Sequence, residues 1–92
     1  MAAVPLDQPI RRADVLWRRS GDQILIRRPG HEHVTVLAST GVALWTELAE
    51  PMTVGELAER LATAHQADLD QVSADVQAAI ATLVADEVVL AG

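Results

Sequence analysis

The chain has 92 residues, 50% of them hydrophobic and 22% charged, which predicts one small soluble globular domain and excludes a disordered chain. It has no cysteine, so disulfides and thiolate zinc sites are excluded, and no apolar run approaches the roughly 18–20 residues of a membrane helix. The net charge of −6 and the scarcity of aromatic residues remove the phosphate attraction and stacking groups on which nucleic-acid binding depends. We therefore expect neither a nucleic-acid partner nor a membrane partner.

The first residues are expected to lie outside the folded domain. Residues 1–12 contain Pro5 and Pro9 and are predicted to form a flexible N-terminal arm, and residues 13–92 a single domain. The arm has neither the basic start nor the apolar stretch of a secretion signal, so a cytoplasmic location is expected.

Three short strands are predicted next, from residues rich in β-branched and apolar side chains. They cover residues 14–19, 23–28 and 33–37. Turn residues separate them, and such short connections produce an antiparallel meander.

The register of these strands stays open. If Arg19 faces Gln23 across a three-residue turn, then Trp17 faces Leu25 and shares its face of the sheet. A one-residue slip would exchange the two faces. In either register both faces are apolar, although a sheet with helices on one side should have a polar outer face. The outer face is therefore expected to be covered by something else.

Three helices are predicted after residue 38, where the apolar period changes to 3.6. They cover residues 39–49, 54–66 and 69–86, and a short apolar tail at residues 88–90 follows. Ser39 or Thr40 can cap the first helix, a Thr53–Glu56 capping box opens the second, and Asp68 opens the third in the same way. Strands grouped before helices predict an α+β, winged-helix-like domain with a three-stranded antiparallel sheet followed by a three-helix bundle.

Catalytic motifs are scarce. His31, Glu32 and His33 could bind a divalent metal, but they lie in a polar turn, where such residues are normally just solvated. The serines have no neighbouring base, and the glycines form no phosphate cradle. We therefore expect no enzyme, no catalytic residue, no metal and no cofactor.

Arginine pairs at residues 18–19 and 27–28 give the sheet a basic fringe. Each pair on a strand sends one side chain to either face. One interpretation is solubility and protection of the sheet edge. The other is a docking surface for an acidic peptide or protein, through bidentate contacts with carboxylates.

Several segments resemble one family in their order and spacing. They are Leu37–Trp45, Thr53–Leu57, Asp75–Val76 and Leu83–Val84. Together they are similar to pyrroloquinoline quinone biosynthesis protein D, the PqqD-like proteins, whose fold is the RiPP recognition element. The resemblance covers residues 14–90. The chain departs from the family pattern at Ala38, usually polar, at Val42, commonly alanine, and at Asp86–Glu87, where a glycine is frequent.

The resemblance implies a stand-alone adaptor that binds the leader of a ribosomally made precursor peptide. Such adaptors present the peptide to a modifying enzyme, such as a radical SAM protein, a cyclase or a leader protease. The leader adds as a strand to the edge of the third strand, and its apolar side chains enter a groove beside the third helix. The implied edge residues are His33, Val34, Thr35, Val36 and Leu37. The implied groove wall is formed by Val72, Asp75, Val76, Ala79, Ile80 and Leu83.

Two alternatives remain open. A winged-helix DNA-binding regulator requires a basic recognition helix, but residues 69–86 hold three acids and no arginine. A dimerisation module would explain the two apolar faces of the sheet. A homodimer stays open as well, because an exposed strand edge can pair with itself.

Overall fold

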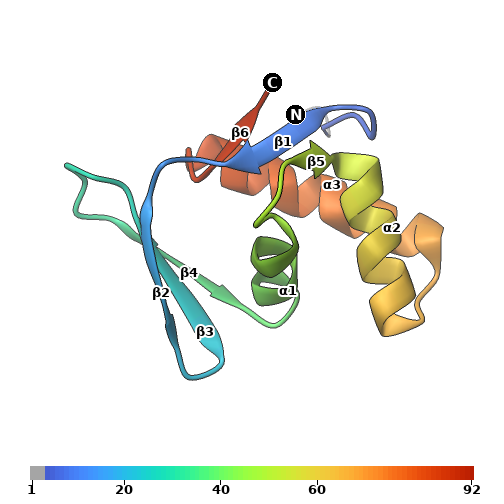
Figure 1. Ribbon diagram of the computed structural model, residues 1–92, viewed down its shortest axis with the longest axis horizontal. Helices are drawn as coiled ribbons and strands as arrows, with labels where there is room; N and C mark the ends of the chain where they lie inside the picture. The colour runs from blue at the N-terminus through green and yellow to red at the C-terminus, as the bar shows by residue number, and fades with distance from the viewer. Residues whose placement is uncertain (1–3) are drawn as a thin grey trace.

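The computed structural model describes residues 4–92, so residues 1–3 of the expected arm lie outside the described residues. Its elements, in chain order, are β1 (Pro9–Arg12), β2 (Leu16–Ser20), β3 (Gln23–Arg27), β4 (Val34–Ala38), α1 (Thr40–Glu47), β5 (Met52–Thr53), α2 (Val54–His65), α3 (Leu69–Ala85) and β6 (Val89–Ala91) (Figure 1). The predicted α+β class is confirmed, with the three-stranded antiparallel sheet ahead of the three helices. No helix within residues 4–92 combines the length and the apolar character required to cross a membrane.

The predicted meander is the sheet β2–β3–β4, and its register differs by one residue from the pairing considered first. Ser20 pairs with Gln23, so the hairpin turn has two residues, Gly21 and Asp22, instead of three. Gly21, at the first central position of the turn, has a φ of 61°, which glycine adopts without a steric penalty. Asp22, at the second central position, does not have a positive φ, so the turn is of type II′. Trp17 therefore pairs with Ile26 and lies on the opposite face of the sheet from Leu25.

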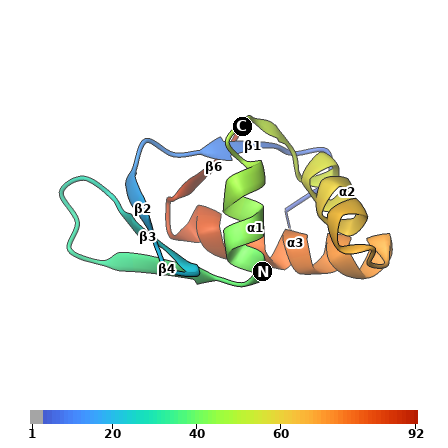
Figure 2. The same cartoon turned by 60° about the horizontal axis from the view of Figure 1, so that its bottom comes forward.

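The two faces of this sheet have different surroundings. The inner face carries Ile24, Ile26 and Leu37, which are buried. The helices lie on this side of the sheet in both views of the ribbon (Figures 1 and 2). The opposite side, here called the outer face, consists of the remaining cross-strand partners: Leu16, Arg18, Ser20, Gln23, Leu25, Arg27, Val34, Val36 and Ala38.

A second sheet, β5–β1–β6, was not predicted. Residues 9–12, which were expected in the flexible arm, form β1 and pair with β5 and with β6. The expectation of an arm is wrong for these residues, because Ile10 is buried at 1% exposure. The backbone carbonyls of Leu6 and Gln8 also accept hydrogen bonds from the N–H groups of Gly55 and Val54. Those two amides begin α2 and have no partner within the helix.

The predicted helices are all present, and two of them begin with the predicted caps. Thr53 and Glu56 form the reciprocal capping box of α2, with N···O distances of 3.1 and 3.2 Å. At α3 the Asp68 carboxylate accepts from the Gln71 N–H at 3.0 Å, but the Gln71 side chain donates to Asp75 instead of returning the bond. Ser39 precedes α1 at a φ of 52° and makes no side-chain cap. Its hydroxyl therefore contributes nothing to the start of this helix.

Helix α3 ends in a Schellman motif. The Val88 N–H donates to the Leu83 carbonyl, and the Glu87 N–H donates to the Val84 carbonyl. Glu87 has a φ of 61°, the left-handed conformation that this position requires. Glycine takes that conformation without a steric penalty. This is a physical reason why a glycine is frequent in the family pattern where this chain has Asp86–Glu87.

The two sheets and the helices share one core, with Trp45 of α1 fully buried in it. Arg12 of β1 packs against the two tryptophan rings of the chain. Its guanidinium lies 4.7 Å from the centre of the Trp45 ring and 4.9 Å from that of Trp17. Its Nε donates to the Trp45 carbonyl at 3.1 Å, and Nη2 donates to the same oxygen. That oxygen lies in the last turn of α1, where carbonyls lack helical partners and a cation is favourable.

Candidate functional site

Strand β4 is an edge of the meander. In the described part of the chain it pairs with β3 alone, and the strand order β2–β3–β4 leaves its other side open. It contains no proline, so nothing in its backbone prevents a further strand from pairing. The edge predicted to accept a peptide is therefore an edge in the structure.

The hairpin register determines which backbone groups of β4 point away from β3. A two-residue hairpin closes on a hydrogen-bonded pair, here Ser20 with Gln23, and hydrogen-bonded pairs then alternate along the strands. Ile24 and Ile26 therefore direct their N–H and C=O groups toward β4, where Leu37 and Thr35 are their partners. It follows that Val34, Val36 and Ala38 direct theirs toward the open edge.

The side chains of the predicted edge residues divide between the two faces. Val34 and Val36 lie on the outer face at 43% and 52% exposure. Thr35 is half-buried and Leu37 is buried on the inner face. His33 is exposed and precedes the strand. Val34 and Val36 therefore have both outward-pointing backbone N–H and C=O groups and exposed apolar side chains.

The predicted wall residues on α3 differ in burial. Val76, Ile80 and Leu83 are buried at 1%, 0% and 5% exposure, in the same core cluster as Leu37. Val72 and Ala79 are only partly buried, and Asp75 is exposed. The three buried wall residues and Leu37 of β4 therefore belong to one hydrophobic core. Only Val72, Asp75 and Ala79 retain surface that a ligand could contact directly.

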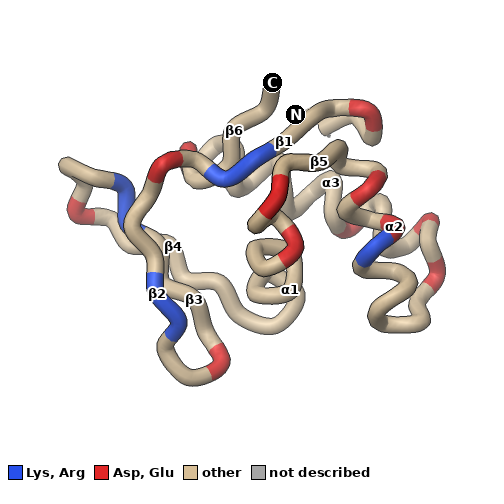
Figure 3. The backbone as a smooth tube through the Cα atoms, viewed as in Figure 1, with Lys and Arg blue, Asp and Glu red and all other residues tan. Residues whose placement is uncertain are grey.

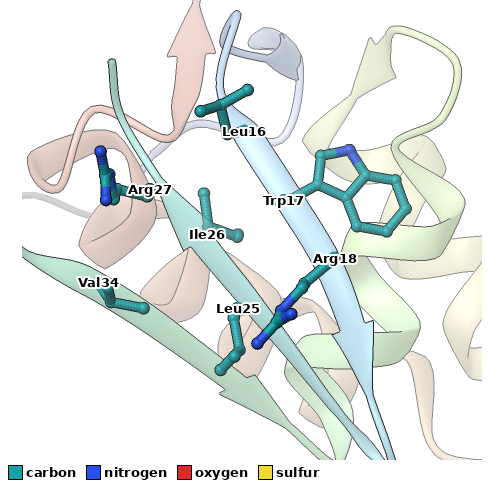
Figure 4. A pocket seen from close by; sticks show the side chains of 7 residues that line it. All are labelled: Leu16, Trp17, Arg18, Leu25, Ile26, Arg27 and Val34. Atoms are coloured by element: carbon teal, nitrogen blue, oxygen red, sulfur yellow. The ribbon is translucent and has the colours of Figure 1, made fainter. Parts of the chain in front are cut away.

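A hollow of about 430 Å³ lies on the outer face of the sheet. Its lining includes Leu16, Leu25 and Val34, one from each strand, with Arg18 and Arg27 beside them (Figure 4). No individual residue was predicted to form it. The only indication of it in the sequence was the apolar character of both sheet faces. The observed register, with its two-residue turn, places Leu16 on the outer face.

Charge is distributed unevenly around the candidate site. The arginines of the N-terminal part lie in and beside the strands, whereas the helices carry mainly acids (Figure 3). Arg12 is the one described group whose pKa is clearly displaced, and burial lowers it. No three His, Asp or Glu side chains within residues 4–92 lie close enough together to hold a metal ion.

One comparison with known proteins gives a match. A family model described as coenzyme PQQ synthesis protein D (PqqD) matches residues 24–89, from β3 to the first residue of β6. No curated protein and no solved structure matches the chain. The match includes β4 and α3, the two elements that carry the predicted site residues.

Proposed function

The chain belongs to the PqqD family, and from this premise we propose that it is an adaptor for the leader of a ribosomally made precursor peptide. At the level of the family it is a peptide-binding accessory protein of the PQQ-biosynthesis type. The finer proposal is that it binds the leader by strand addition. It then presents the peptide, in the cytoplasm where the ribosome releases it, to a modifying enzyme.

The observation that carries this proposal is the open edge of β4. Three residues of a five-residue strand, Val34, Val36 and Ala38, direct N–H and C=O groups away from β3. An extended peptide can complete these groups in the same way as a fourth strand would. Each such hydrogen bond contributes about 0.5–1.5 kcal/mol net, so several together supply useful affinity.

The side chains of the added strand would alternate between two environments. Those opposite Val34 and Val36 would lie beside them on the outer face. The intervening side chains would point to the helical side of the sheet. There we assign the wall to Val72, Asp75 and Ala79, which keep exposed surface, while the buried Val76, Ile80 and Leu83 support it from the core.

The test is a fluorescence-anisotropy titration with labelled leader peptides encoded beside this gene. Val36→Pro removes one outward N–H without removing a bond to β3, so the variant should fold. We expect its leader affinity to fall at least about tenfold, from the lost hydrogen bond and the clash of the ring with an added strand.

Two control variants separate the edge from its side chains. Val36→Thr keeps the N–H and the β-branched shape, and should bind within about threefold of the native chain, because the main-chain bonds are unchanged. Arg19→Pro removes an outward N–H from the opposite edge, on β2, and should bind normally. No saturable binding by the native chain would refute the adaptor function. An equal loss in Arg19→Pro and Val36→Pro would refute the assignment to β4.

A further inference from the structure

The outer face of the β2–β3–β4 sheet has a regular composition. Cross-strand partners form one row of Leu16, Arg27 and Val34 and a second row of Arg18, Leu25 and Val36. Each row therefore contains two apolar side chains and one arginine. Helices cover only the other face of this sheet (Figures 1 and 2).

The apolar members of these rows are open to solvent. Leu16 is 62% exposed, Val34 43% and Val36 52%, and Leu25, which also lines the hollow, is half-buried. Contiguous exposed apolar side chains surrounding a hollow are typical of surfaces that bind another molecule.

The charge of the outer face is opposite to that of the chain. The face has two arginines and no acid, whereas the chain has a net charge of −6. Within residues 4–92 neither Arg18 nor Arg27 forms an ion pair, in contrast with Arg28, which pairs with Glu87 at 2.6 Å. Both guanidinium groups are therefore available to carboxylates of another molecule.

A second copy of the chain fits this face poorly. Two outer faces packed together about a two-fold axis would bring the four arginines close to each other and join two molecules of like net charge. A partner with apolar side chains and carboxylates satisfies both components of the face.

We propose that the outer face, which adjoins the leader edge and shares Val34 with it, is a docking surface for an acidic amphipathic segment of the partner protein to which the peptide is presented. Apolar side chains of that segment fill the hollow between Leu16, Leu25 and Val34, and its carboxylates pair with Arg18 and Arg27. The identity of the partner rests on the proposed function. The apolar and acidic character of its docking segment is inferred from the residues of the outer face alone.

The test uses residues of β2, because two strand spacings, about 10 Å, separate this strand from the open edge of β4. The probe is the peptide-modifying enzyme encoded beside this gene, titrated against native chain, Arg18→Glu and Leu16→Ser. We expect each variant to bind the enzyme at least about tenfold more weakly, and the native affinity to fall as salt is raised from about 0.05 to 0.5 M. The matched control is Arg19→Glu, an exposed neighbour on the other face, which should bind as the native chain does.

Leader affinity is measured on the same variants, and should stay within about twofold of native because the β4 edge is untouched. If the native chain does not bind the leader, the proposed function is refuted. The enzyme titration would still test the docking surface by itself. Unchanged enzyme binding in Arg18→Glu and Leu16→Ser would overturn the docking surface. So would a native dimer in sedimentation velocity that Leu16→Ser dissociates, because a second copy would then occupy the face.

Discussion

Replacing Arg12 by methionine removes the cation that joins β1 to the end of α1 while keeping an unbranched apolar stem in its place. The native guanidinium donates twice to the Trp45 carbonyl and lies against the rings of Trp17 and Trp45, which meet edge to face at 6.0 Å. The methionine side chain can fill the space between the rings but cannot donate to the carbonyl.

The expected cost follows from these contacts. Two donations to one oxygen make a single charge-assisted interaction of about 1.5–3 kcal/mol. Contacts with two aromatic rings at a half-buried position add about 1–2 kcal/mol. Methionine buries no charge, so the desolvation cost of the guanidinium disappears and offsets part of these losses. The free energy of unfolding should therefore fall by about 2–4 kcal/mol. For a domain whose whole stability is about 5–15 kcal/mol, that is a large fraction.

Urea unfolding followed by tryptophan emission measures this loss. With an m-value of about 1.5 kcal/mol/M, the midpoint should fall by roughly 2 M. Burial lowers the pKa of Arg12. The folded chain therefore holds this proton less tightly than the unfolded chain, and the linkage can raise stability only in strongly alkaline solution. The difference between native and Arg12→Met should accordingly be constant from about pH 5 to pH 9.

Two further variants make this reasoning refutable. Arg11→Met alters the exposed neighbour, for which no side-chain bond is described within residues 4–92, and should change stability by no more than about 0.5 kcal/mol. Arg12→Lys keeps the charge without the planar fork and should fall between native and Arg12→Met. If Arg12→Met were no less stable than Arg11→Met, the interaction would not stabilise the fold.

Three other changes probe local backbone geometry, each measured by the same unfolding assay. Ser39→Gly should stabilise the chain by about 0.5–1 kcal/mol, because Ser39 has a positive φ and no capping bond to lose; a destabilised variant would contradict this. Glu87→Gly should be about 1 kcal/mol more stable than Glu87→Gln, since both lose the Arg28 pair and only glycine relieves the left-handed backbone; equal stability would contradict it. Thr53→Ala should cost about 1 kcal/mol through loss of the capping box, whereas the exposed Thr63→Ala should cost much less; equal losses would argue against the cap.

The elements that could be predicted from the sequence are those with a long periodic pattern. The apolar spacing of residues 69–86 and the Thr53–Glu56 cap determine α3 and the start of α2, and both are present within a residue or two. The register of β2 could not be predicted, because it depends on whether Ser20 belongs to the turn or to the strand. That choice is made by the backbone angle of Gly21, which residue types alone do not reveal.

The second sheet escaped prediction for a different reason. Its strands have two to four residues each, too few to show an alternating pattern, and β1 starts at a proline. For the candidate site, the position of β4 at the sheet edge was predictable from the order of the strands. The burial of Val76, Ile80 and Leu83 was not, because a broad apolar stripe does not show which part of it faces the interior.

Pairing of β1 with β6 has a consequence for how the domain is made. Residues 10–12 pair with residues 89–91, so β1 has its longer pairing with a strand that is synthesised well after it. Contacts between such distant segments slow folding, since the chain must close a large loop before they form. The meander and the first two helices can assemble during translation, while Ile10 and Val89 reach their buried positions only after residues 89–91 have left the ribosome.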